Sequence, residues 1–291
     1  MKGYLFPGQG SQYVGMGKVL YHHSRQARQM FETADHILDM DLTYLMLEGS
    51  QEALKATTVA QPAIFLHSVV TALVSDSFHP AAVAGHSLGE ISALVASGVM
   101  PFEEGLHLVA VRSKAMEQAC QLCPGTMAAV LGLRDEVVEE ICATITQEVV
   151  VPANYNCPGQ LVISGSQAGV ALAMAALTQA GARKVIPLQV EGGFHAPLMV
   201  HAQESLAAVL SSISFSKGIC PIYQNVTGQA VTDPQTIKEN LIQQLVAPIY
   251  WTKTINHMIA DGITAFVECG PGAVLQGLTR KIAPALAIEA M

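Results

Sequence analysis

A serine set between two glycines is the clearest sign of chemistry in this chain. The segment 83–89, Val-Ala-Gly-His-Ser-Leu-Gly, joins an apolar run typical of a short buried strand to residues 88–97, which have the composition of a helix. At so sharp a turn, side chains at Gly85 and Gly89 would collide with neighbouring backbone, so only glycine fits while the Ser87 hydroxyl is held out at the sheet edge. Ser87 is therefore a candidate nucleophile, although G-x-S-x-G also arises by chance in glycine-rich proteins.

Backbone amides near Ser87 are candidates for stabilising an oxyanion. Leu88 begins the predicted helix, so its N–H has no acceptor within that helix. Residues 7–12, Pro-Gly-Gln-Gly-Ser-Gln, follow a first predicted strand over residues 2–6, and such a loop should lie at the same sheet edge as Ser87. The loop lacks the Gly-Lys-Ser/Thr ending of a phosphate loop, so we interpret it as a polar loop beside the serine.

Two charged or titratable residues could act together with Ser87. Arg112 follows four apolar residues in a helix predicted over residues 102–120; because an unpaired guanidinium is costly to bury, it either binds an anion or reaches water along its stem. His195 follows paired glycines at a loop-to-helix junction, where it is either a general base or a structural histidine. His86 is not the expected base, because consecutive side chains point apart.

Composition limits the classes of protein to consider. The 291 residues are 51% hydrophobic and 13% charged, which favours a compact α/β protein whose sheet is covered by helices on both faces. A net charge of −8 argues against partners such as nucleic acid or an anionic membrane surface. The six cysteines and the lack of an export signal indicate reduced thiols and a cytoplasmic location. Cys120 and Cys123 form a close pair but have no nearby further ligands, so we expect no metal site.

The chain divides into two predicted subdomains. Residues 126–190 read as β-α-β-β-α-β, the order of a ferredoxin-like unit. We expect this unit to be inserted into a larger α/β-hydrolase-like subdomain made of residues 1–125 and 191–291, with the active site in the cleft between them. In the larger subdomain, helices are expected from residue 63, after Pro62, and over residues 240–246.

Taken together, these motifs resemble the malonyl-coenzyme A:acyl carrier protein transacylases of fatty acid and polyketide synthesis. The resemblance covers nearly the whole length and rests on motifs in the family's order: Phe6-Pro7-Gly8-Gln9-Gly10-Ser11-Gln12, Gly85-His86-Ser87-Leu88-Gly89-Glu90, Gly193-Phe194-His195, Trp251-Thr252 and Glu268-x-Gly270-Pro271-Gly272. It implies that Ser87 accepts the acyl group and that His195 is its general base. The backbone N–H groups of Gln9 and Leu88 would form the oxyanion hole.

The resemblance also implies how the substrate and the base are held. Arg112 would bind the malonyl carboxylate, and a backbone carbonyl, expected at Tyr250, would orient His195 in place of an acid. Asn156 matches a polar residue that lines the family's cleft. Phe194 before the histidine resembles members that select malonyl over methylmalonyl groups, whereas Ala196 stands where relatives often have a small polar residue.

The implied reaction transfers a malonyl group from malonyl-CoA, through a Ser87 acyl-enzyme, to the phosphopantetheine thiol of an acyl carrier protein. It needs no metal or cofactor, and we expect a monomer. Two alternatives stay open: a serine hydrolase that clears acyl groups from carrier proteins, and a catalytically silent module that only docks a carrier protein. Arg112 argues against the first, and an intact Ser87 and His195 against the second.

Overall fold

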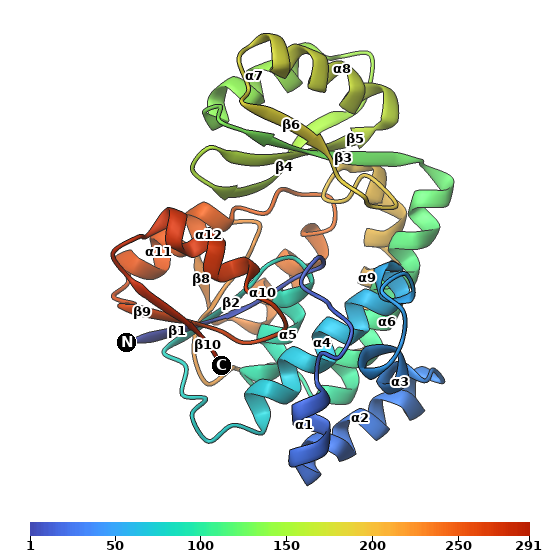
Figure 1. Cartoon of the computed structure of the whole chain (residues 1–291), viewed down its shortest axis with the longest axis vertical. Helices are drawn as coiled ribbons and strands as arrows, with labels where there is room; N and C mark the ends of the chain where they lie inside the picture. Colours follow the sequence, from blue (N-terminus) through green and yellow to red (C-terminus); the bar gives the residue numbers. More distant parts are fainter.

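Two β-sheets frame the molecule, one above the other in Figure 1. The computed structural model describes all 291 residues. The strands of the larger sheet are β1 (Lys2–Phe6), β2 (Ala82–Gly85), β7 (Ile222–Tyr223), β8 (Ala230–Val231), β9 (Ala265–Glu268) and β10 (Ala287–Ala290). Their order is β10-β9-β1-β2-β7-β8, and every neighbouring pair is parallel except β7 with β8.

Both faces of the larger sheet are buried, because apolar residues on its central strands alternate between two cores. Tyr4 and Phe6 belong to a core of 46 buried residues, whereas Leu5 between them belongs to a core of 14. Val83 on β2 joins the first core, and the alanines on either side of it join the second. The register places Phe6 opposite Gly85 at the ends of parallel strands, so the loop after β1 and the turn after β2 meet at one edge of the sheet.

Ten α-helices belong to the subdomain that contains this sheet. They are α1 (Lys18–His23), α2 (Arg25–Leu38), α3 (Leu42–Leu47), α4 (Thr57–Leu73), α5 (Leu88–Ala96), α6 (Phe102–Leu122), α9 (Val200–Leu210), α10 (Pro234–Gln243), α11 (Trp251–Ala260) and α12 (Val274–Ile282), with short 3₁₀ turns at Ala53–Lys55 and Pro197–Met199. Helices α4, α5 and α6 pack on one another, and α9 packs on α6. None of the helices has the length and apolar character needed to cross a membrane.

The smaller sheet has two helices on its outer face (Figure 1). Its strands are β3 (Gly125–Leu131), β4 (Val150–Cys157), β5 (Gln160–Ser166) and β6 (Lys184–Pro187), and its helices are α7 (Asp135–Thr144) and α8 (Gln167–Gln179). The strand order is β4-β5-β3-β6 and all pairs are antiparallel. Ala128 and Val130 face the helices in a core of 10 residues, whereas Met127 belongs to the main core.

The predicted fold class, an α/β-hydrolase-like subdomain with an inserted ferredoxin-like one, is confirmed. The exact limits of the insertion, residues 126 and 190, stay a prediction.

Two expected helices were placed wrongly. Helix α4 begins at Thr57 and contains Pro62, which therefore does not open it, and α10 spans Pro234–Gln243 because Asp233 caps its first turn by accepting a hydrogen bond from the Thr236 N–H.

The turn between β2 and α5 generates a stability prediction. A Cβ at Gly89 would collide with the carbonyl of Phe6, so we expect Gly89→Ala to destabilise the fold by about 3 kcal/mol or more. Gly277→Ala is the matched control: it lies within α12 with open space around it and should stabilise the fold by roughly 0.5–1 kcal/mol. Urea denaturation of the three proteins checks this, and equal midpoints for Gly89→Ala and wild type would contradict it.

Candidate active site

The turn that carries Ser87 has the geometry of a nucleophile elbow. Ser87 lies between β2 and α5 with a φ of 53° and a ψ of −109°, which side-chain-bearing residues rarely adopt. A Cβ at Gly85 would collide with the backbone of Gly89, and one at Gly89 with Phe6. The two glycines thus allow strand and helix to approach closely enough for this turn, as the sequence predicted.

Two buried amide side chains hold this strained backbone. The Oδ1 atom of Asn225 accepts a hydrogen bond of 2.7 Å from the Ser87 N–H, and its Nδ2 donates to the carbonyl oxygen of Gly85 at 2.6 Å. The Nε2 atom of Gln244 donates to the Ser87 carbonyl oxygen at 3.1 Å. Glu90 on α5 in turn accepts a hydrogen bond from the backbone N–H of Asn225 at 2.8 Å. The conformation of Ser87 is therefore fixed from both sides.

His195 is placed to remove the proton of Ser87. Its Nε2 lies 2.8 Å from Ser87 Oγ, and its Nδ1 lies 2.8 Å from the backbone carbonyl oxygen of Gln244. Because a carbonyl oxygen only accepts hydrogen bonds, Nδ1 carries the proton of the neutral ring and Nε2 is left as an acceptor for the serine hydroxyl. A backbone carbonyl thus sets the tautomer, a task that an acid performs in a Ser-His-Asp triad.

The environment keeps His195 neutral. The ring is buried, and burial together with the positive charge of Arg112 lowers the pKa of His195 to about 3. At neutral pH the imidazole therefore has a free lone pair on Nε2. A neutral imidazole hydrogen-bonded to a serine hydroxyl is the arrangement that general-base catalysis requires.

Arg112 is fully buried on α6 beside the nucleophile. Its Nη2 donates to Ser87 Oγ at 3.0 Å and to Gln244 Oε1 at 3.2 Å, and its Nη1 donates to Gln61 Oε1 at 2.7 Å. Burial lowers the pKa of Arg112 to about 10, and the buried Glu90 carboxylate acts in the opposite direction. The guanidinium therefore stays charged at neutral pH, yet no carboxylate lies within ion-pair distance of it.

The two predicted oxyanion donors both lie at the cavity beside Ser87. Leu88 is the first residue of α5, so its N–H has no acceptor within the helix. The side chain of Gln9 is hydrogen-bonded to Thr57 and Gln61, while its backbone N–H donates to no protein atom. Two free backbone donors are thus available next to the nucleophile.

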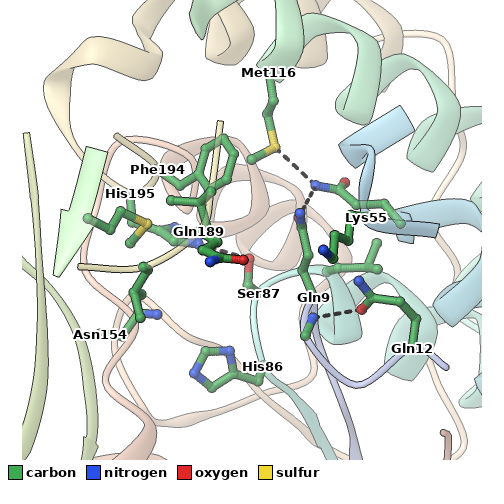
Figure 2. Close-up of a pocket in the computed structure, with 16 residues that line it drawn as sticks. Gln9, Gln12, Lys55, His86, Ser87, Met116, Asn154, Gln189, Phe194 and His195 are labelled. Carbon is green, nitrogen blue, oxygen red and sulfur yellow. Dashed lines mark hydrogen bonds between the residues drawn. The ribbon is translucent and has the colours of Figure 1, made fainter. Parts of the chain in front are cut away.

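A cavity of about 340 Å³ opens in front of Ser87, between the two subdomains. Figure 2 shows Ser87 between Phe194 and His195 on one side and Gln9 and Gln12 on the other. The cavity is lined by Gln9, Gly10, Gln12, Lys55, Gln61, His86, Ser87, Leu88, Met116, Met127, Asn154, Leu188, Gln189, Val190, Phe194 and His195.

Asn156 was predicted to line this cavity, and that prediction is wrong. Its Oδ1 lies 2.9 Å from His86 Nε2, and the lining residue is Asn154, whose buried Oδ1 has no hydrogen-bond partner. The pairing of β4 with β5 shifts register between Tyr155 and Cys157, so the simple alternation of side chains breaks here. The position of Asn154 two residues earlier could not be read from the sequence.

The sequence analysis expected the Tyr250 carbonyl to orient His195, and that expectation is wrong. The carbonyl that orients His195 belongs to Gln244. The Tyr250 carbonyl oxygen instead accepts hydrogen bonds from the backbone N–H and hydroxyl of Thr254 in the first turn of α11. Sequence reasoning also missed the roles of Gln244 and Asn225 in holding Ser87 and that of Gln61 at Arg112. The one available sign was Gln61 itself, a polar residue that stands just before Pro62 and the apolar run 63–66.

Comparison with known proteins places the whole chain in a family. The family model of the acyl transferase domain matches residues 3–284. The malonyl CoA-acyl carrier protein transacylase of Bacillus subtilis (strain 168) is 42% identical over 283 residues, which cover 96% of this chain and 89% of that protein. An acyl carrier protein S-malonyltransferase from Vibrio cholerae O1 has a TM-score of 0.95 and 40% identity, covering 100% of this chain and 96% of that one.

A further solved structure contains a malonyl-transacylase in complex with its type II PKS acyl-carrier protein. It has a TM-score of 0.95 and 36% identity, and the match covers 100% of this chain and 95% of that one. In both solved structures, a sequence identity of 36% or 40% over nearly the full length accompanies the same fold. The chain belongs to the malonyl CoA-acyl carrier protein transacylases within the acyl transferase family, and it is an acyltransferase.

Proposed function

We propose that this enzyme transfers a malonyl group from malonyl-CoA to the phosphopantetheine thiol of an acyl carrier protein through an ester on Ser87. One observation carries the proposal: Ser87 Oγ contacts both a neutral imidazole, His195 at 2.8 Å, and a buried guanidinium, Arg112 at 3.0 Å. The first contact suits acyl transfer, and the second suits an acyl group that carries a carboxylate.

The first half-reaction loads the serine. Ser87 Oγ attacks the thioester carbonyl carbon while His195 Nε2 takes the hydroxyl proton. The carbonyl oxygen becomes an oxyanion that accepts hydrogen bonds from the backbone N–H groups of Gln9 and Leu88. When the carbon–sulfur bond breaks, the coenzyme A sulfur takes the proton from His195, and the malonyl ester stays on Ser87.

The second half-reaction runs the same steps with a different thiol. The phosphopantetheine thiol gives its proton to His195 Nε2 and attacks the ester carbonyl. The bond to Ser87 Oγ breaks, and that oxygen recovers the proton from His195. One cavity therefore serves two thiols in turn, which makes the scheme ping-pong. Arg112 would hold the malonyl carboxylate in both halves, with Phe194 lining the same cavity.

A hydrolase of carrier-bound acyl groups could use the same serine and histidine, so the acceptor must be tested. We expect malonyl-loaded enzyme to lose its acyl group rapidly to holo acyl carrier protein and slowly to water. Apo carrier protein, which lacks the phosphopantetheine thiol, is the matched control and should not accelerate the loss. Intact-protein mass spectrometry follows both proteins; equal loss with holo and apo carrier would identify a hydrolase instead.

We propose that the product supplies chain extension in cytoplasmic fatty acid or polyketide synthesis. The relative solved with a type II PKS acyl-carrier protein and the relatives named malonyl CoA-acyl carrier protein transacylases support a carrier protein as the partner. Each malonyl group moved in this way keeps its free carboxylate.

Substrate selection generates a second prediction. Arg112→Ala removes the carboxylate anchor, so the ratio of kcat/KM for malonyl-CoA to that for acetyl-CoA should fall by about 100-fold. Lys114→Ala is the control, because Lys114 lies two residues along the same helix but is exposed, and its ratio should equal that of wild type. An unchanged ratio in Arg112→Ala would place the carboxylate anchor elsewhere.

A further inference from the structure

Gln61 separates the Arg112 guanidinium from the cavity. Gln61 is buried on α4 and lines the cavity, whereas Arg112 does not reach the cavity surface. The Gln61 Oε1 atom accepts the hydrogen bond of 2.7 Å from Arg112 Nη1. The other terminal nitrogen, Nη2, donates to Ser87 and Gln244. Every acceptor that Arg112 now has is therefore a neutral oxygen.

The Nε–H of Arg112 is buried without a partner, whereas the two terminal nitrogens are bound to Gln61 and Ser87 on the side of the cavity. A carboxylate that pairs with both terminal nitrogens from the cavity therefore has to replace one of those oxygens. Bidentate pairing needs two parallel N–H donors directed at the two carboxylate oxygens. Arg112 has three neutral acceptors. Two of them, Gln61 Oε1 and Ser87 Oγ, belong to residues that line the cavity, whereas the third belongs to Gln244, which does not line it. An acyl group on Ser87 also changes that oxygen from hydroxyl to ester. The acceptor that remains to be displaced from the cavity side is Gln61.

The rest of the Gln61 amide is held only loosely. Its Nε2 lies 3.4 Å from Gln9 Oε1 and 3.5 Å from Met116 Sδ, and both of these contacts are drawn as dashed lines ending on Gln9 and Met116 in Figure 2. Both are long or weak for an amide donor. Since Oε1 makes the one short bond of this side chain, losing it frees the amide to turn within the cavity wall.

We propose that Gln61 is a specificity-determining residue that occupies the carboxylate position on Arg112 and is exchanged for the malonyl carboxylate. The inference rests on the proposed function. In the empty site the amide supplies a buried guanidinium with an acceptor, which lowers the cost of keeping it desolvated. A malonyl carboxylate displaces it, because a pair in which both arginine and its acceptor are ionised is stronger than arginine bound to a neutral amide oxygen. An acetyl group offers no replacement, so Gln61 stays.

Replacing the neutral amide with a permanent carboxylate tests this exchange. Gln61→Glu keeps the side-chain length and places a carboxylate on Arg112, where the substrate carboxylate cannot easily displace it. The rate of acyl-enzyme formation with malonyl-CoA should fall by about 100-fold, while that with acetyl-CoA changes by less than about threefold. The malonyl-to-acetyl rate ratio, measured by rapid quench and intact-protein mass on one preparation, is independent of the fraction of folded enzyme.

Two further variants keep the test decisive. Gln51→Glu makes the same exchange of amide for carboxylate at an exposed position that neither lines the cavity nor contacts Arg112; its ratio should equal that of wild type. Gln61→Met has similar length and only a weakly accepting sulfur, so its ratio should equal or exceed the wild-type ratio. This second variant also serves if Gln61→Glu does not fold.

The outcomes separate this inference from the proposed function. If wild-type enzyme forms no malonyl ester on Ser87, the proposed function fails. If wild type is loaded with malonyl and Gln61→Glu is loaded with the same ratio, the function stands and the exchange is overturned. A ratio in Gln61→Met that falls below the wild-type value would also overturn it, because Gln61 would then act only as a structural support for Arg112.

Discussion

The strained backbone of Ser87 is the constraint on which the rest of the site depends. A φ of 53° at a residue with a side chain costs on the order of 1–3 kcal/mol. The structure holds it with hydrogen bonds on both sides of the residue: the Ser87 N–H donates to Asn225 Oδ1, and Gln244 Nε2 donates to the Ser87 carbonyl oxygen. In this conformation the hydroxyl points away from the sheet and toward His195.

Gln244 links the three groups that share this chemistry. Its backbone carbonyl fixes the tautomer of His195, its Nε2 binds the Ser87 backbone, and its Oε1 accepts from Arg112. Nucleophile, base and cation therefore keep a common geometry although they come from different parts of the chain. The absence of a buried acid behind the histidine also matters, because with only a carbonyl beside it burial keeps the ring neutral.

The parts of this site that depend on local sequence could be predicted, and the parts that depend on distant backbone could not. Gly85 and Gly89 reveal the turn because steric exclusion at a strand-to-helix junction selects glycine. The carbonyl behind His195 was assigned to Tyr250 and found at Gln244, since every residue has a carbonyl and its direction follows from the path of the chain. A local bulge likewise placed Asn154, and not Asn156, at the cavity.

The measurement that tests the account most directly is the intact mass of the enzyme after brief mixing with malonyl-CoA, without carrier protein, followed by peptide mapping. The geometry around Ser87 predicts one malonyl adduct on that residue, formed rapidly in wild type and missing in Ser87→Ala. A malonyl adduct of equal yield in Ser87→Ala, or on another residue of the wild-type enzyme, would contradict the central claim that the strained serine is the nucleophile.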